Sequence, residues 1–184
     1  ATVFGAGGGT SSYREVEDAE VICLWGSNAR ETHPIFFHHV LKAVRKGARV
    51  HVVDPRRTSS AEWAENWLPV RVGADVALAN GIARVILDEG LEHREFVANA
   101  TEDFERYRAH VMQHDVAWAA ERTGVPTERI QKLAREYAKA ERAMICWTLG
   151  ITEHHNAVDN VLSLINLGLL TGHVGKWGSG LNPL

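Results

Sequence analysis

Val21-Ile22-Cys23-Leu24-Trp25-Gly26-Ser27-Asn28 begins as an unbroken apolar run and ends in three small or polar residues. A strand that is apolar at every position has both faces buried, as the inner strands of a parallel sheet do. The glycine that follows can let a ligand approach the backbone closely. We therefore expect a central parallel strand at residues 21–25 that leads into a functional loop.

Strand-like and helix-like segments alternate along the rest of the chain. The expected helical regions are residues 34–46, 60–65, 75–89, 93–141 and 156–170. The further expected strands are residues 49–53, 68–72 and 143–149, and the tail at 175–183 is expected to be a loop. Such alternation produces parallel strands joined by right-handed crossovers. The expected fold is therefore α/β, with a doubly wound, mainly parallel sheet and helices on both faces, a Rossmann-like three-layer sandwich.

The size and charge of the chain limit its possible functions. With 184 residues it can form one domain with its own hydrophobic core, and we treat residues 1–184 as a single domain. The formal net charge is −3 and the sequence has no long basic run. Non-specific electrostatic binding to nucleic acid or to an anionic membrane is therefore not expected.

Cys23 and Cys146 are the two cysteines, and both lie within apolar runs. We interpret them as reduced core residues, because the sequence has no Cys-x-x-Cys pair with the usual spacing of zinc or iron–sulfur ligands. The longest apolar stretch, Val161 to Leu170, is interrupted by polar residues and is too short to span a bilayer. Direct membrane insertion is therefore not expected.

The carboxyl ends of the strands are the expected place for a ligand, because open parallel sheets bind ligands there. Four loops follow the strands, at residues 26–34, 54–58, 73–75 and 150–153. They are far apart in sequence, and only aligned parallel strands would bring them to one edge, where we expect a concave polar groove. The residues on which this expectation depends most are Asn28, Asp54, Asp75 and Gly150.

These loops carry the chemistry of a nucleotide site. Asn28 has donor and acceptor atoms, and Thr32 has a hydroxyl. The helix that begins at Pro34 has free N–H groups suited to phosphate oxygens. Asp54 can accept from ribose hydroxyls or from the paired N–H donors of guanine, and Arg56 can offer a planar fork to phosphate. The sequence lacks the Gly-x-Gly-x-x-Gly fingerprint of nicotinamide enzymes.

Each motif alone also has a simpler interpretation. Asp54-Pro55-Arg56 after a strand is a common turn, and Asp75 could be only a helix cap. The pairs His38-His39 and His154-His155 suggest a metal site, but adjacent helical residues point about 100° apart. We interpret both pairs as surface or packing residues, and the six tryptophans as core and interface residues. The ordered combination of the four loops is more specific than any member.

That combination resembles the molybdopterin oxidoreductase superfamily, which contains dimethyl sulfoxide reductases, nitrate reductases and formate dehydrogenases. The resemblance extends from about residue 5 to the end of the chain. Within the superfamily, Glu95-Phe96-Val97, Thr101-Glu102-Asp103-Phe104-Glu105 and Gly180-Leu181-Asn182-Pro183-Leu184 look like segments of formate dehydrogenases. The motifs shared with the superfamily are Gly26-Ser27-Asn28 with His33-Pro34, Asp54-Pro55-Arg56-Arg57-Thr58, Gly73-Ala74-Asp75-Val76-Ala77-Leu78, Trp147-Thr148-Leu149-Gly150-Ile151-Thr152 and Leu169-Leu170-Thr171-Gly172-His173-Val174-Gly175-Lys176.

The resemblance implies a bis(molybdopterin guanine dinucleotide) cofactor with Mo or W, and this domain would hold one of its nucleotides. Two departures from the family pattern concern hydrogen-bonding groups: Glu153 stands where Gln is frequent, and Ala74 replaces a residue with a hydroxyl. Carried over onto this sequence, the cofactor-binding residues would be Gly26, Asn28, Glu31, Thr32, Asp54, Arg56, Gly73, Asp75, Leu149, Gly150, Thr152 and Glu153.

The family's metal-ligating cysteine or selenocysteine would lie upstream of this chain. We therefore expect no catalytic residue and no metal ligand here, and no activity of the chain by itself. The resemblance implies a parent protein of the formate dehydrogenase alpha subunit type, which oxidises formate to carbon dioxide by two electrons. Alternatives are another molybdopterin oxidoreductase, such as a nitrate reductase, and a cofactor-free scaffold subunit derived from the family.

The beginning of the chain looks like the middle of a longer protein. It starts at Ala1 and opens into a glycine-rich stretch, residues 4–9, which we interpret as an ordered turn or a hinge. The expected partners are the remaining domains of the parent subunit, electron-transfer subunits and formate as the substrate. An iron–sulfur cluster is expected elsewhere in the parent. No signal peptide is visible, and a cytoplasmic location is expected.

Overall fold

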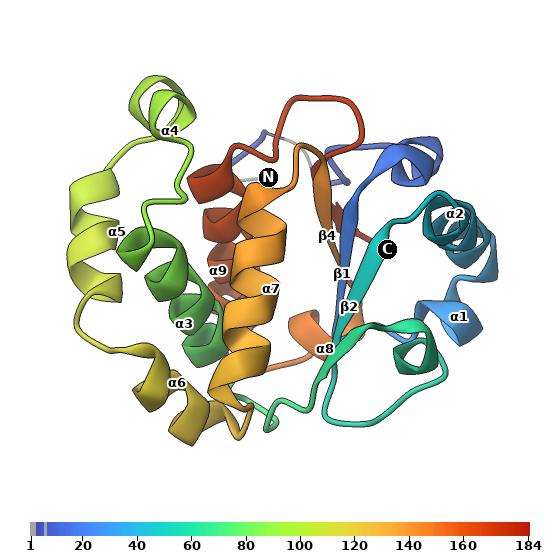
Figure 1. The fold of residues 1–184 in the computed structure, drawn as a ribbon, viewed down its shortest axis with the longest axis horizontal. Coiled ribbons are helices and arrows are strands. Elements are labelled where there is room, and N and C mark those ends of the chain that lie inside the picture. Colours follow the sequence, from blue (N-terminus) through green and yellow to red (C-terminus); the bar gives the residue numbers. More distant parts are fainter. Residues whose placement is uncertain (1–2, 6) are drawn as a thin grey trace.

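Five parallel strands form the centre of the molecule (Figure 1). The computed structural model describes residues 3–5 and 7–184, so Ala6, which belongs to the predicted turn or hinge, lies outside the described residues. The order across the sheet is β3-β2-β1-β4-β5, which confirms the doubly wound parallel sheet. The strands are β1 (Val21–Trp25), β2 (Arg49–Val53), β3 (Asn66–Leu68), β4 (Ala143–Trp147) and β5 (Gly180–Pro183).

The carboxyl ends of the central strands lie level with one another. Trp25, the last residue of β1, is in register with Val53 of β2 and with Trp147 of β4. The chain order reverses between β1 and β4, because β2 and β3 extend the sheet in one direction and β4 and β5 extend it in the other. Such a reversal leaves a crevice at the carboxyl ends of the two central strands.

Helices cover both faces of the sheet (Figure 1). One face packs against α3 (Asp75–Asp88), α7 (Thr127–Lys139) and α9 (Ala157–Thr171), and the other packs against α2 (Pro34–Arg45). The remaining helices are α1 (Ala29–Thr32), α4 (Arg94–Ala100), α5 (Phe104–Val111), α6 (Val116–Thr123) and α8 (Leu149–Thr152), with 3-10 turns η1 (Tyr13–Asp18) and η2 (Ala61–Trp63).

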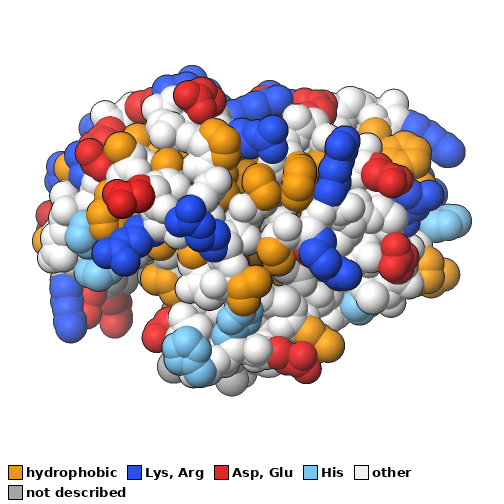
Figure 2. All heavy atoms as spheres, turned by 90° about the horizontal axis from the view of Figure 1, so that it is seen from below, with side chains coloured by type: hydrophobic (Ala, Val, Ile, Leu, Met, Phe, Trp, Pro, Cys, Tyr) orange, Lys and Arg blue, Asp and Glu red, His pale blue; other side chains and the backbone are white. Residues whose placement is uncertain are grey.

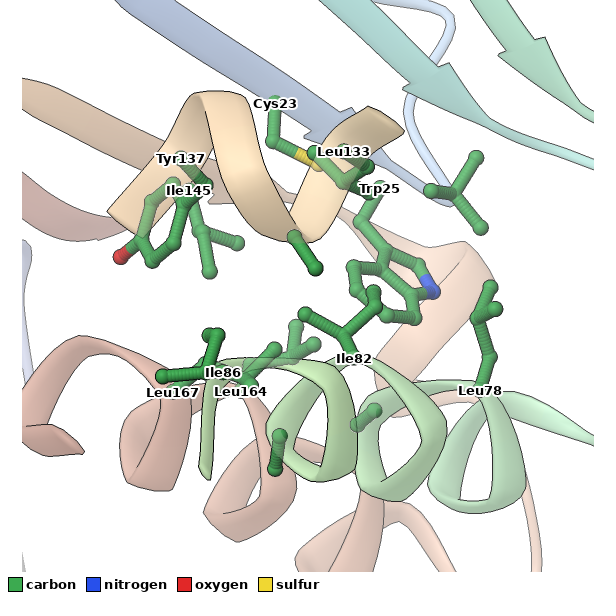
Figure 3. Close-up of a cluster of buried hydrophobic side chains, with 14 of the residues drawn as sticks. Cys23, Trp25, Leu78, Ile82, Ile86, Leu133, Tyr137, Ile145, Leu164 and Leu167 are labelled. Atoms are coloured by element: carbon green, nitrogen blue, oxygen red, sulfur yellow. The ribbon is translucent and has the colours of Figure 1, made fainter. Parts of the chain in front are cut away.

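The side chains of β1 alternate between two hydrophobic clusters. Val21, Cys23 and Trp25 belong to the cluster on the α3 side, part of which Figure 3 shows. Ile22 and Leu24 belong to the cluster on the α2 side. Successive residues of a strand point to opposite faces, so an entirely apolar strand supplies both cores. This arrangement confirms the three-layer sandwich.

The expectation of a loop at residues 175–183 is wrong for its last part, because Gly180–Pro183 form β5 beside β4. Glycine and proline give a segment little local preference for a strand. Pairing with β4 provides the stabilisation that the local sequence lacks. Pro183 is tolerated because β5 lies at the edge of the sheet.

The strand expected at residues 68–72 lies instead at Asn66–Leu68. Pro69 follows it and has no N–H to donate to a neighbouring strand. Asn66, a poor strand former by propensity, is buried, and its side-chain amide lies 3.2 Å from Nδ1 of His51 on β2. The strand therefore begins two residues earlier than expected and ends before Pro69.

The expected helical region from residue 93 to 141 consists of four separate helices, α4 to α7. Gly124, with a φ of 74°, ends α6 in a left-handed conformation. The expected strand at 143–149 ends at Trp147, because Leu149 already begins α8. The helix expected at 60–65 is only the 3-10 turn η2. The buried residues of α7 are Ile130, Leu133, Ala134 and Tyr137, whose spacing places them on one face of the helix.

Both cysteines are free and buried, as expected for reduced core residues. Burial raises the pKa of both thiols, that of Cys146 to about 12. Among the described residues, none of the helices has the length and the apolar character needed to cross a membrane.

Candidate functional site

A pocket of about 410 Å³ opens at the carboxyl ends of β1, β2 and β4, beside the reversal of strand order. Figure 2 views the molecule from this end, and Lys and Arg side chains lie around the middle of that face. A cavity of this size at the switch point of a parallel sheet is typical of a ligand site. Its lining residues are Gly26, Asn28, Thr32, His33, Val53, Asp54, Pro55, Arg56, Val70, Val72, Asp75, Thr148, Leu149, Gly150 and His154.

The pocket brings together residues from all four expected loops. This confirms the geometric expectation, since the loops after β1, β2, β3 and β4 do open on the same edge of the domain. The eight expected site residues that line the pocket are Gly26, Asn28, Thr32, Asp54, Arg56, Asp75, Leu149 and Gly150.

The loops after β1 and β4 are in direct backbone contact. The carbonyl oxygen of Gly26 accepts hydrogen bonds from the N–H of Gly150 (3.2 Å) and from the hydroxyl of Thr148 (2.7 Å). A Cβ atom added at Gly150 would lie only 2.6 Å from that oxygen. A Cβ atom added at Gly26 would likewise lie 2.8 Å from the carbonyl carbon of Gly150. Gly26 therefore allows the close approach of the neighbouring loop, a role that the sequence did not indicate.

Asn28 links the loop after β1 to the loop after β2. Its Oδ1 accepts from the hydroxyl of Ser60 (3.1 Å), and the hydroxyl of Ser59 lies at the same distance. The Ser59 hydroxyl is also 2.7 Å from Oε1 of Glu31, and its hydrogen bond is the main cause of a lowered pKa of Glu31. The two serines were missed in the sequence, although they directly follow the Asp54-to-Thr58 motif.

Asp54 follows β2 and has only 6% of its surface exposed. Its Oδ1 accepts from the backbone N–H of Arg56 (2.8 Å), and within the described residues this is the only hydrogen bond that its carboxylate makes. Burial raises the pKa of Asp54, and the N–H and the charge of Arg56 oppose that effect. The carboxylate therefore keeps acceptor capacity for a ligand that donates hydrogen bonds.

Asp75 is the first residue of α3, and the interpretation of Asp75 as its N-cap is wrong. Ala74 occupies the N-cap position, and no side chain caps the helix there. The Asp75 carboxylate instead accepts from the indole N–H of Trp25, at 2.8 Å between Nε1 and Oδ1. Burial raises the pKa of Asp75, the Trp25 hydrogen bond lowers it, and the charge of Asp54 raises it further. Two buried carboxylates therefore lie in one pocket, and Asp54 contributes to the raised pKa of Asp75.

Cationic and imidazole groups lie around the same pocket. Arg56 and His33 line it, and Arg56 is exposed. His154 also lines it, and its Nε2 donates to the carbonyl oxygen of Gly150 (3.0 Å). His154 is partly exposed, and the turn between α8 and α9 brings it to the edge of the pocket. No group of histidines, cysteines and carboxylates among the described residues is arranged to hold a metal ion.

Four expected site residues do not line this pocket. Glu31 contacts Ser59, and Gly73 lies in an exposed turn with a φ of 81°. Thr152 lines a different, apolar cavity next to Trp147, and Glu153 is exposed. Their part in binding remains a prediction.

The pocket suits a ligand with donors at one position and anionic oxygens at another. Among the described residues, neither Asp54 nor Asp75 forms a salt bridge, so N–H or O–H groups of a ligand would compensate for their burial. Arg56 provides a guanidinium group for phosphate oxygens. The lining thus combines hydrogen-bond acceptors with a cationic group.

The chain matches the family model described as "Molybdopterin oxidoreductase" over residues 4–184. It is 39% identical over 181 residues to the F420-dependent formate dehydrogenase subunit alpha of Methanocaldococcus jannaschii, with 98% of this chain and 27% of that protein covered. It is 36% identical over 180 residues to formate dehydrogenase H of Escherichia coli, with 98% of this chain and 25% of that protein covered. The chain thus spans about a quarter of the length of these relatives.

A solved structure, the acetylene hydratase from Pelobacter acetylenicus, has the same fold with a TM-score of 0.83. The sequence identity is 27%, and the likeness covers 92% of this chain and 25% of that chain.

Proposed function

The chain belongs to the molybdopterin oxidoreductase family, and we propose that it binds the guanine dinucleotide portion of a molybdopterin cofactor. Family membership implies a molybdopterin cofactor with Mo or W. The guanine dinucleotide form and the contacts within the pocket are our proposal.

The observation that carries the proposal is the convergence of Asp54 and Asp75 in one open pocket. Both carboxylates are 6% exposed, and both have a pKa raised by burial. Guanine presents paired N–H donors and ribose presents hydroxyls, so either group would supply the missing hydrogen bonds. Arg56, on the same side of the pocket as Asp54, would contact the phosphates. Asn28, Thr32 and the backbone from Leu149 to Gly150 would complete the binding surface.

When bound, the metal–pterin group supplies the two-electron chemistry. The residues of this chain hold and orient it. Fixing the nucleotide at one end of a long cofactor limits where the pterin at the other end can lie. Thr148 and Gly150, on the loop that is bonded to Gly26, make that part of the surface rigid. We further propose that an iron–sulfur cluster and the metal ligand belong to other segments of the full-length protein.

For the full-length protein we propose a Mo- or W-dependent formate dehydrogenase, with this chain as one domain of a larger subunit that works with electron-transfer subunits. The relatives named as formate dehydrogenases support this proposal. A different reaction within the family is the second candidate, because the acetylene hydratase has the same domain. A cofactor-free scaffold is less favoured, since side chains leave the pocket open.

The test uses the full-length protein purified from its natural host. Mo and W are measured by plasma mass spectrometry, and guanine is measured as GMP released by acid hydrolysis. We expect metal, GMP and formate-dependent dye reduction. Metal without GMP would refute the guanine dinucleotide form. Oxidation of a reduced viologen dye by nitrate, without dye reduction by formate, would favour the second candidate.

Asp54→Ala tests the site itself. Loss of a hydrogen bond to a charged group costs about 1.5–3 kcal/mol, so cofactor retention should fall roughly 10- to 150-fold. Asp88→Ala is the matched control, because Asp88 ends α3 about 20 Å away from Asp75 along the helix. Equal GMP content in the two variants would count against Asp54, and a collapsed melting temperature of Asp54→Ala alone would indicate a structural role.

A further inference from the structure

Trp25 is held rigidly behind the pocket. It is the last residue of β1 and is 0% exposed. Figure 3 shows its indole among Leu78 and Ile82 of α3, Leu133 of α7 and other members of the cluster on the α3 side. Close packing on this scale leaves a large side chain a single rotamer. The direction in which its N–H points is therefore fixed by the core.

That N–H is directed at a carboxylate of the pocket. Nε1 of Trp25 donates to Oδ1 of Asp75 at 2.8 Å. Asp75 lines the pocket and Trp25 does not. Among the described residues, no side chain other than Trp25 donates a hydrogen bond to the Asp75 carboxylate. The residues lie 50 positions apart in sequence, so the contact depends on the packing of α3 against β1.

We propose that Trp25 is a positioning residue: its indole N–H sets the orientation of the Asp75 carboxylate toward a hydrogen-bond donor of the bound nucleotide. This inference rests on the proposed function, because it needs a ligand in the pocket. Asp54 has an equivalent support from its own loop, the N–H of Arg56. The largest hydrogen-bond contribution to the pKa of Asp75 comes instead from the core, through the indole N–H of Trp25.

The hydrogen bond also affects the charge of Asp75. Burial raises the pKa of Asp75, whereas the Trp25 N–H lowers it. Two other titratable groups act on Asp75: Asp54 from the loop after β2 raises its pKa, and His154 from the α8–α9 turn lowers it. Without the indole N–H, Asp75 would be protonated at a higher pH. A ligand held by the ionised carboxylate would then be released at a higher pH.

Trp25→Phe removes the donor and keeps an aromatic ring in the core. Trp147→Phe is the matched control, because Trp147 is the register partner of Trp25 on β4, is 5% exposed and does not line the pocket. The full-length holoprotein is incubated across a pH series and desalted, and the retained cofactor is measured as GMP after acid hydrolysis. We expect retention by Trp25→Phe to be roughly tenfold lower, with its loss on acidification displaced to higher pH, and wild-type behaviour of Trp147→Phe.

A second variant leaves Trp25 and its packing intact. Asp75→Glu keeps the charge but moves the carboxylate by one methylene, so it should lose retention as Trp25→Phe does. In a double-mutant cycle, Trp25→Phe should add little to Asp75→Glu, because the two changes remove the same contact.

The outcomes separate the two proposals. A wild-type protein without GMP would refute the proposed function and this inference together. A wild-type protein with GMP, whose Trp25→Phe variant matches Trp147→Phe, would overturn the inference alone. If Trp25→Phe does not fold, Asp75→Glu decides, since wild-type retention and pH profile would mean that the position of the carboxylate does not matter.

Discussion

Gly150→Ala should separate the loops after β1 and β4. A Cβ atom at residue 150 would lie 2.6 Å from the carbonyl oxygen and 2.7 Å from the Cα atom of Gly26, and both are backbone atoms that cannot rotate away. Ordinary van der Waals contact begins at 3.4 Å, so the two backbones must move apart by roughly 0.8 Å. The hydrogen bonds from Gly150 and Thr148 to Gly26 would lengthen with them.

The change in the free energy of unfolding caused by Gly150→Ala is the balance of two opposing effects. Forcing a methyl group into a filled space costs about 1–3 kcal/mol. Replacing glycine by alanine restricts the unfolded chain and offsets about 0.4–1 kcal/mol of that cost. We expect a net destabilisation of roughly 1–2 kcal/mol. Cofactor binding should be weakened more strongly than the fold, because a binding site needs its groups within about 0.5 Å of their productive positions.

The assay compares the melting temperature and the GMP content of the full-length protein with those of the Gly150→Ala variant. Gly8→Ala is the control, because a Cβ at Gly8 would meet nothing within 4 Å, and it should stay within about 0.5 kcal/mol of wild type. Wild-type melting temperature and GMP content for Gly150→Ala would refute the close contact of the two loops. A lower melting temperature with full GMP content would refute the link between that contact and binding.

Two further predictions concern the buried ionisable groups. Burial raises the folded-state pKa values of Asp54 and Asp75. The stability that these groups contribute is therefore present below the unfolded-state pKa and is lost as the pH rises through the folded-state pKa. A difference of one pKa unit between the two states corresponds to about 1.4 kcal/mol. Asp54→Asn and Asp75→Asn should therefore raise the melting temperature of cofactor-free protein at pH 7 and change it less at pH 4, and an unchanged or lower value at pH 7 would contradict this. Cys23 and Cys146 are buried, and burial raises the pKa of both thiols. An alkylating reagent should therefore modify neither cysteine until denaturant is added, as mass spectrometry can map. Labelling of either cysteine in the native protein would contradict the described core.

The central part of the fold could be predicted because its signals are local. The apolar runs of β1 and β4 need no partner to be recognised as inner strands. β2 is indicated by its three valines, Val50, Val52 and Val53, although Arg49 and His51 stand among them. Once three such strands are parallel, their following loops must open on one edge. The meeting of Asn28, Asp54 and Gly150 follows from that rule without knowledge of any contact.

The features that the sequence did not predict depend on contacts between distant residues. β5 exists because β4 has a free edge, whereas its own glycine and proline oppose a strand. Aspartate is a residue type that often caps helices, yet the Asp75 carboxylate accepts a hydrogen bond from the indole N–H of Trp25. His154 reaches the pocket only through the turn between α8 and α9. Local propensity gives no information about any of these contacts.

The burial of two carboxylates in one pocket supports the proposal that the pocket binds a ligand. At neutral pH, Asp54 and Asp75 are held in a largely buried site, close enough that the charge of one raises the pKa of the other. Without a ligand such an arrangement destabilises the fold, because ionised groups that lose water need compensating partners. Asparagine at either position would keep the hydrogen bond to Arg56 or Trp25 without this cost. Two buried carboxylates at the place where four loops meet therefore support the proposed binding of a ligand that donates hydrogen bonds, as the base and ribose of a guanine nucleotide would.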